Sequence, residues 1–269
     1  MTLHRTPGRH RAAASIATLL AAAVLAGCGA LRRTTVPIET RLDRAACTPA
    51  ADTLVVMLPG AYSESSEFVT EGFVPALRER RIAADVLRVE AHLGYYNRRS
   101  IVDRLEADVF EPARRPGSGY RSVWVVGISI GGFGALLHEA QHPGRVDGIV
   151  LIAPYLGQRL LSTDISVAGG LARWNPPMAG TPLEEAESGV WRWLQAQGVP
   201  PAAAGLPPRV PVYLGYGLDD RFAFSHRLLA DALPAQRVFT TPGGHDWPEW
   251  RRLWGQALDV LPLPVCAPG

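Results

Sequence analysis

The feature that most limits the possible folds is a serine placed between a strand pattern and a helix pattern. An apolar run, Ser122–Val126, leads directly into Gly127-Ile-Ser-Ile-Gly131, and a helical pattern follows from Gly132. The Gly-x-Ser-x-Gly pattern alone is weak, because it would occur by chance in roughly one such chain in ten. The context is specific, because a serine at a sharp strand-to-helix turn has a strained backbone that only small neighbours accommodate. The sequence therefore predicts that Ser129 is a nucleophile at such a turn.

The rest of the chain alternates short apolar runs with helical patterns, which predicts an α/β fold with a mostly parallel central sheet and flanking helices. Runs that are apolar on successive residues are typical of strands covered on both faces. The expected strands are Leu54–Leu58, Asp85–Val89, Ser122–Val126, Gly148–Ile152, Val210–Leu214 and Arg237–Thr240. The expected helices are Glu67–Arg81, Ser100–Arg114, Gly132–His142, Arg221–Leu233 and Pro248–Leu261.

One segment, residues 156–208, departs from this rhythm and is expected to form a small cap-like excursion. It contains many prolines and glycines and also Trp174, Trp191 and Trp193. Open α/β sheets bind ligands beyond the carboxyl ends of their strands, and an excursion between two strands can cover that edge. The alternative is a surface loop without a functional role.

A serine needs a base to take its proton, and the base needs an acid to orient it. On this scaffold the expected chain order is serine, acid, histidine. His245 lies in a glycine-rich loop after the last strand and before the last helix, which predicts that it is the base. Asp219 and Asp220 follow a strand that ends at Gly217. We favour Asp220 as the acid and expect Asp219 to cap the next helix; Asp246 is expected to be a cap or a loop-fixing carboxylate.

These motifs resemble the α/β-hydrolase superfamily over residues Thr53 to Leu261. The run Gly-Gly-His245-Asp-Trp-Pro-Glu-Trp resembles the esterase-D-like branch of carboxylesterases, feruloyl esterases and mycolyltransferases. The resemblance implies an oxyanion hole built from two backbone N–H groups, Ile130 and either Ala61 or Tyr62. It implies ester cleavage through an acyl-enzyme, without a metal or an organic cofactor. Acyl transfer to an alcohol or amine by the same three residues is an alternative, as is a non-catalytic envelope lipoprotein with this fold.

The N-terminus has the pattern of a bacterial lipoprotein signal. Arginines precede an apolar segment from Ala12 to Ala26, and Leu25-Ala-Gly-Cys28 closes it with small residues. We expect residues 1–27 to be a signal peptide, Cys28 to be lipidated and residues 28–51 to be a tether. The folded domain is then 52–269, held at the periplasmic face of the cell envelope, on the outer membrane if the source is Gram-negative. Cys47 and Cys266 remain, and in an oxidising compartment an even remainder predicts a disulfide.

Composition excludes some functions. The chain has 269 residues and a net charge of +2, which does not favour a nucleic-acid partner. It contains no lysine, so Schiff-base, P-loop and Ser-Lys chemistries are excluded. The expected partners are a small-molecule or lipid-like ester and, through the anchor, a membrane. The sequence does not indicate an oligomeric state.

A second motif, His138-Glu139-Ala-Gln-His142, matches the zinc-protease pattern His-Glu-x-x-His. Pro143 ends the helix directly after the second histidine, and no third ligand lies at a suitable spacing, so we favour a structural role for these residues. His92, Tyr95 and Tyr96 follow a predicted strand and are weaker candidates for substrate contact.

Overall fold

The computed structural model describes residues 32–47, 50–176, 180–198 and 209–267. The predicted signal segment and Cys28 lie outside these ranges. Within them, no helix has the length and apolar character needed to cross a membrane.

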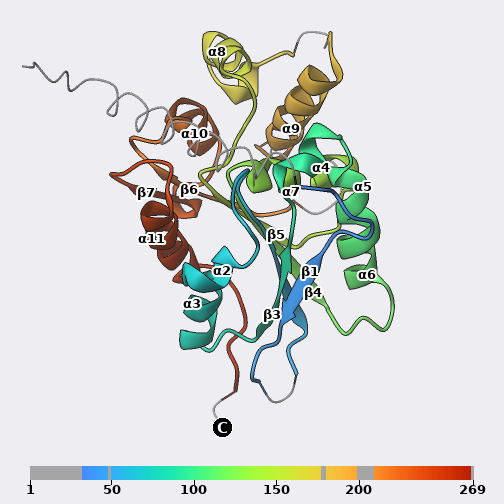
Figure 1. Ribbon diagram of the computed structural model, residues 1–269. Coiled ribbons are helices and arrows are strands. Elements are labelled where there is room, and N and C mark those ends of the chain that lie inside the picture. The colour runs from blue at the N-terminus through green and yellow to red at the C-terminus, as the bar shows by residue number, and fades with distance from the viewer. Residues whose placement is uncertain (1–31, 48–49, 177–179, 199–208, 268–269) are drawn as a thin grey trace, which may run out of the picture.

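Seven strands form one sheet in the order β1-β3-β2-β4-β5-β6-β7 (Figure 1). Every neighbouring pair is parallel except β1 with β3, so the prediction of a mostly parallel α/β sheet is confirmed. The strands are β1 (Thr40–Asp43), β2 (Thr53–Leu58), β3 (Ala84–Val89), β4 (Ser122–Ile128), β5 (Gly148–Ile152), β6 (Val212–Gly217) and β7 (Val238–Thr241).

The strand β1 lies inside the segment that the sequence analysis assigned to a tether. Its four residues are polar or half-exposed, and they pair antiparallel with β3 at the edge of the sheet. The chain before it is also attached: Arg32 forms an ion pair with Glu90 at 2.5 Å, and the Thr35 N–H donates to the Tyr95 hydroxyl. An edge strand with so little apolar character gives no periodic signal, so the tether prediction is wrong for these residues.

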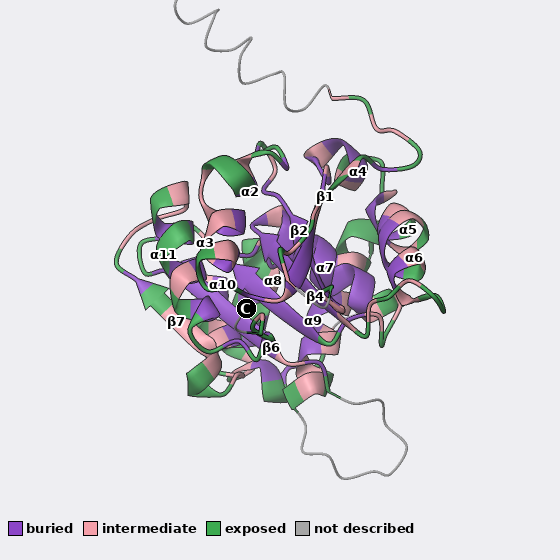
Figure 2. Cartoon of the chain, turned by 90° about the horizontal axis from the view of Figure 1, so that it is seen from below, coloured by how far each residue is buried: buried purple, intermediate pink, exposed green. Residues whose placement is uncertain are grey.

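Helices cover both faces of the sheet (Figure 2). All five predicted helical segments are present, although Gly72, with φ of 84°, breaks the first into two helices. Besides the α-helices, the described chain has one π-helical turn, η1, and two 3-10 turns, η2 and η3. In chain order these elements are α2 (Glu67–Thr70), α3 (Phe73–Glu79), α4 (Leu93–Asn97), α5 (Ile101–Leu105), η1 (Glu106–Phe110), α6 (Glu111–Arg114), α7 (Ile130–Gln141), α8 (Arg159–Val167), η2 (Leu171–Arg173), α9 (Pro182–Gly198), α10 (Ala223–Ala230), η3 (Ala235–Arg237) and α11 (Trp247–Leu258).

The core has two halves, one on each face of the sheet. Alternate residues of β2 point to opposite faces, so Val56 packs with α5 and α7 while Met57 packs with α3 and α11. The strand is buried at all six positions, which is why its sequence is apolar without alternation.

The excursion between β5 and β6 contains α8, η2 and α9. It packs through buried groups: Trp191 is fully buried and its indole N–H donates to the Leu156 carbonyl at 2.8 Å. Trp174 is also buried, and Trp193 is partly buried against the same core. These contacts show that the described part of the excursion is a packed layer over α7 and the loop after β5, and not a free surface loop.

The order of the strands reverses at β2, because the chain passes from β2 to β3 on one side and then to β4 on the other. At such a point the loops that leave adjacent strands diverge and open a crevice at the carboxyl edge. The loop after β2 and the serine turn after β4 therefore face each other across this crevice.

A disulfide joins Cys47 to Cys266, whose Cα atoms are 5.3 Å apart. The C-terminal segment also pairs with the chain before β3, through a bridge between Ile82 and Val265 and a bond from the Cys266 N–H to the Arg81 carbonyl. The disulfide closes a long loop, because its two cysteines have a sequence separation of 219 residues.

We expect the paired substitution Cys47→Ser and Cys266→Ser to lower the free energy of unfolding by about 2–5 kcal/mol, because the cross-link restricts the unfolded chain. Guanidinium unfolding monitored by tryptophan fluorescence measures it. Reductant should move the wild-type midpoint and leave that of the double variant unchanged. A wild-type midpoint that is insensitive to reductant would contradict the expectation.

Candidate active site

The turn from β4 into α7 holds Ser129 in a left-handed conformation, with φ of 52° and ψ of −117°. Four backbone bonds fix it: the Ser129 N–H donates to the Ile152 carbonyl, and its carbonyl accepts from the N–H groups of Tyr155, Gly132 and Phe133. The space around this turn is also restricted, because a Cβ on Gly131 would collide with the carbonyl of Leu58. Gly131 is therefore required by the close approach of β2, and Gly127 by that of the backbone of Gly131 and Gly132.

Ser129, His245 and Asp220 form a continuous hydrogen-bonded chain. The Ser129 Oγ lies 3.0 Å from His245 Nε2, and His245 Nδ1 lies 2.7 Å from Asp220 Oδ2. Because a carboxylate only accepts, the proton of the neutral ring belongs on Nδ1, and Nε2 is free to accept from the hydroxyl. The three residues come from the ends of β4, β6 and β7, as the sequence predicts.

The carboxylate of Asp220 is fully buried but well satisfied. Burial alone would raise the pKa of Asp220, yet the hydrogen bond to His245 and another from the Phe222 N–H, at 2.7 Å, together hold this pKa below its usual value. Asp220 therefore stays ionised near neutral pH and can accept a hydrogen bond from the proton-bearing Nδ1 of His245.

Two aromatic rings hold the imidazole of His245 from its sides. Phe222 and Trp250 each contact it edge-on, with ring centroids 5.2 Å away. The side chain of His245 is 10% exposed, so one edge remains accessible while the rest is packed. Sequence reasoning did not identify these aromatic residues, because an isolated Phe or Trp beside a loop has the same pattern as a core residue.

The loops that carry the acid and the base are joined by backbone bonds. The Leu218 N–H donates to the Thr241 carbonyl, and the Asp219 N–H donates to the Gly243 carbonyl. A Cβ on Gly217 would collide with Gly243, so this contact requires glycine. The prediction that Asp219 caps the next helix is wrong, since Phe222 is the N-cap of α10. Asp246 does cap α11, accepting from the Glu249 N–H, as expected.

The loop Pro59–Tyr62 lies beside the serine, where an oxyanion hole would be needed. A Cβ built on Gly60 would be 3.7 Å from the Ser129 Cβ, and a turn from Gly60 to Ser63 shapes the loop. Ile130 begins α7 directly after the serine. Ile130 and the loop Pro59–Tyr62, which the sequence analysis expects to supply the oxyanion-hole N–H groups, thus both lie next to Ser129.

An apolar cavity of about 530 Å³ opens next to the serine turn. Ile130 and Phe133 from α7 form one wall, Tyr155 forms another, and Leu183 and Ala186 of the cap helix α9 close it. Arg99 and Asp103 provide polar groups in its lining. Such a cavity suits the apolar part of a small ester.

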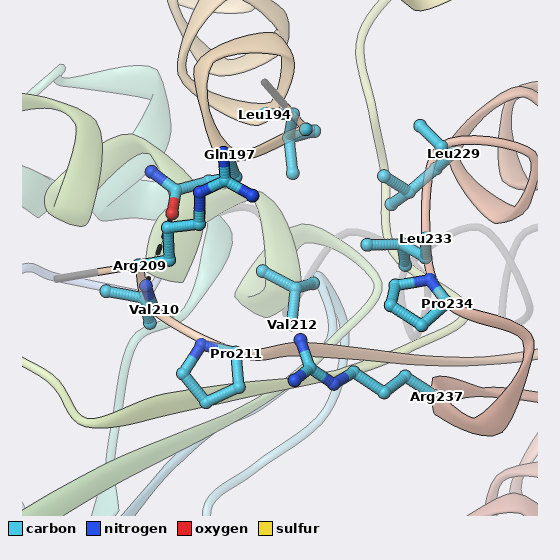
Figure 3. Close-up of a pocket in the computed structure, with 12 residues that line it drawn as sticks. Leu194, Gln197, Arg209, Val210, Pro211, Val212, Leu229, Leu233, Pro234 and Arg237 are labelled. Atoms are coloured by element: carbon cyan, nitrogen blue, oxygen red, sulfur yellow. Dashed lines mark hydrogen bonds between the residues drawn. The ribbon is translucent and has the colours of Figure 1, made fainter. Parts of the chain in front are cut away.

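A separate cavity of about 620 Å³ lies between the end of α9, the start of β6 and the end of α10 (Figure 3). Leu194, Leu229 and Leu233 contribute apolar side chains to it, and Arg209 and Arg237 provide two cations. None of Ser129, Asp220 and His245 lines it, and it begins at the amino end of β6, away from the carboxyl edge where these residues meet.

The remaining candidates from the sequence have structural partners. His138 Nε2 lies 2.9 Å from Glu106 Oε2, and Glu139 accepts from the Gly144 N–H at the end of α7. Burial lowers the pKa of His138 to about 4 and raises that of Glu139 to about 7. Across the described ranges no group of three metal-ligating side chains is present.

His92 caps α4 by accepting from the Gly94 N–H, and Tyr95 is buried with its hydroxyl bonded to Thr35. Only Tyr96 of these three weaker candidates lines the apolar cavity.

Tyr155 and Glu187 are site residues that sequence reasoning missed. The Tyr155 hydroxyl donates to Glu187 Oε1 at 2.7 Å, and its N–H donates to the Ser129 carbonyl. Glu187 belongs to α9 and is 2% exposed. The Glu187 to Tyr155 bond therefore connects the cap to the turn that carries Ser129. The two residues are 32 positions apart in sequence, so no local pattern indicates the pair.

Comparisons with solved structures match the fold. The chain superposes on S-formylglutathione hydrolase FrmB of Staphylococcus aureus with a TM-score of 0.51 at 13% identity, covering 78% of this chain and 80% of that one. FphF, a fluorophosphonate-binding serine hydrolase of the same organism, gives 0.52 at 13%, covering 85% and 95%. Est1E of Butyrivibrio proteoclasticus gives 0.53 at 14%, covering 81% and 90%. At such identities the likeness establishes the fold.

A comparison with curated protein sequences found no relative. The family model described as "Putative esterase" matches residues 96–259. The match spans more than half of the chain and includes Ser129, Asp220 and His245. The chain therefore belongs to this esterase family and has the α/β-hydrolase fold.

Proposed function

We propose that this protein cleaves carboxylic esters through an acyl-enzyme formed on Ser129. The observation that carries the proposal is the chain of hydrogen bonds from Asp220 through His245 to the serine hydroxyl, at 2.7 and 3.0 Å. An unassisted serine is a poor nucleophile, and this arrangement supplies the base and the group that orients it.

In the first half of the reaction the Ser129 oxygen attacks the ester carbonyl, and its proton moves to His245 Nε2. The negative charge that develops on the carbonyl oxygen is stabilised by the N–H of Ile130 and by that of Ala61 or Tyr62. When the tetrahedral intermediate collapses, the bond to the leaving oxygen breaks and the proton on Nε2 passes to that oxygen. An alcohol leaves, and the acyl group stays on Ser129.

In the second half, water gives a proton to His245 and attacks the acyl-enzyme, which releases a carboxylic acid and restores Ser129. Throughout, the low pKa of Asp220 keeps a negative charge beside Nδ1, so the imidazolium is stabilised when it forms. An alcohol that enters in place of water would accept the acyl group, which is the transferase alternative.

We expect Ser129→Ala to lose labelling by a fluorophosphonate probe and to lower kcat/KM for 4-nitrophenyl butyrate by at least about 10⁴-fold. Asp220→Asn should lower it by about 10²–10⁴-fold, because the amide favours the wrong histidine tautomer. Asp219→Asn is the matched control and should remain within about twofold of wild type. Equal losses in the two aspartate variants, or a labelled Ser129→Ala, would contradict the proposal.

Esters with a medium acyl chain should be preferred over acetate, because the apolar cavity beside Ile130 offers about 530 Å³. Ala186→Phe, which places a ring against that space, should lower kcat/KM for 4-nitrophenyl octanoate about tenfold more than for the acetate. Ala172→Phe, at an exposed cap position, is the control. Parallel losses on both esters would show that the acyl chain binds elsewhere.

We also propose that the protein is held at the cell envelope by a lipid on Cys28. The support is the Leu-Ala-Gly-Cys28 pattern together with the Cys47–Cys266 disulfide, since such bonds persist in oxidising compartments. Cys28→Ser should move the protein from the membrane fraction to the soluble fraction, because the acyl chains supply the attachment. Immunoblotting of the two fractions measures it, and a variant that partitions like wild type would reject the anchor.

A further inference from the structure

A third, smaller cavity of about 190 Å³ adjoins the apolar cavity. Tyr155 lines both, so the two cavities meet at this residue. The smaller cavity lies between the start of α8 and the segment that follows Asp220, with Arg159 and Ser162 on one side and Arg221 and Phe222 on the other.

Its character is cationic. Within the described part of the chain, neither Arg159 nor Arg221 has a carboxylate at ion-pair distance, whereas eleven other arginines there do form such pairs. Each guanidinium instead lies over an aromatic ring, Arg159 at 4.8 Å from the centroid of Phe224 and Arg221 at 4.9 Å from that of Phe222. Stacking fixes the plane of a guanidinium and leaves its N–H edges free to donate.

A buried hydroxyl without a partner belongs to the lining of this cavity. Ser162 lines the cavity and is 1% exposed, yet its Oγ has no hydrogen-bond partner among the described residues. A buried hydroxyl in this state is unfavourable unless something completes it.

The helix that carries Ser162 adds a further attraction for an anion. Helix α8 begins at Arg159, and no side chain caps its first turn, so its unpaired N–H groups and positive dipole end lie at the same cavity.

One acidic side chain lies nearby, and both of its oxygens already accept hydrogen bonds. Glu187 approaches Gly157 on the cavity wall, but its two oxygens accept from the Tyr155 hydroxyl and from the Gln158 N–H. It is directed at the wall and not at the two guanidinium groups, so the cavity keeps an excess of donors over acceptors.

One aromatic ring connects the cavity with His245, the proposed base. Phe222 lines it and also contacts His245 at 5.2 Å between centroids. In the proposed reaction His245 returns its proton to the leaving oxygen, so the leaving group must lie on the His245 side of the serine. With the acyl chain in the apolar cavity lined by Ile130 and Tyr155, a leaving group on the His245 side would extend toward Phe222 and Arg221.

We propose that this cavity, formed by Arg159, Arg221 and Ser162, binds an oxyanion, carboxylate or phosphate, carried by the leaving group of the substrate. The inference rests on the proposed function, because it assigns the two sides of the ester from the role of His245. It makes the preferred substrate an ester with an apolar acyl chain and an anionic alcohol or phenol.

The test compares butyrate esters of three phenols: 3-carboxy-4-nitrophenol, its neutral 3-carboxamide analogue and a phosphomethyl analogue. We expect wild type to prefer an anionic ester over the carboxamide by about tenfold in kcat/KM, and we expect the preference to fall with salt. Arg221→Gln and Arg159→Gln should each lower the preference about fivefold, and Arg221→Glu should reverse it. The relative rates of the two anionic esters distinguish carboxylate from phosphate.

Arg173→Gln, an exposed arginine of the cap that does not line the cavity, is the matched control and should keep the wild-type ratio. If its ratio falls as far as that of Arg221→Gln, a general surface charge is responsible and the site is rejected. If wild type cleaves the carboxamide ester but shows no preference for either anion, the site fails while the proposed function stands.

A binding measurement keeps the inference testable without turnover. Calorimetric titration of the free phenols should give a tighter Kd for the carboxylate than for the carboxamide, in wild type and in Ser129→Ala, and equal values would overturn the site. If wild type cleaves no ester and takes no probe, the proposed function is rejected, and this titration alone decides whether the anion binds.

Discussion

The site depends on the left-handed backbone of Ser129 at the end of β4. A side chain pays an energetic penalty in that region of conformational space, and the conformation persists because the surroundings impose it. Here the surroundings are the Ile152 carbonyl, the Tyr155 N–H and the carbonyl of Leu58, which leaves room only for glycine at position 131. Two neighbouring strands and the loop after β5 thus act together on one residue, and the hydroxyl is directed toward the crevice at the reversal of the sheet.

His245 and Asp220, the proposed base and acid, are also positioned by a few backbone contacts. The loops after β6 and β7 are bonded to each other, so His245 and Asp220 do not adjust independently. Phe222 and Trp250 then fix the ring from both sides, and the buried carboxylate stays charged because it accepts two hydrogen bonds. Precise placement of this kind gives a serine hydroxyl its reactivity, since proton transfer requires contact distance.

The sheet and the residues Ser129, Asp220 and His245 could be predicted from the sequence, because the patterns that indicate them are local. Strands buried on both faces, such as β2, have continuous apolar runs, and the loops with Ser129 and His245 contain glycines at fixed offsets. The edge strand β1 could not be predicted, since its four residues bury too little to leave a pattern. The link between Tyr155 and Glu187 and the packing of Phe222 on His245 were also missed, because such pairs are set by tertiary distance and not by spacing along the chain.

The attachment of the chain before β1 determines how the domain would be presented at a surface. Because β1 runs antiparallel to β3, it starts beside the carboxyl end of that strand, and the ion pair of Arg32 with Glu90 keeps the preceding residues there. The first described residue therefore lies at the edge of the sheet where the crevice opens. In the lipid-anchored protein that we propose, attachment through this point would turn the mouth of the crevice toward the lipid headgroups and the Cys47–Cys266 end away from them.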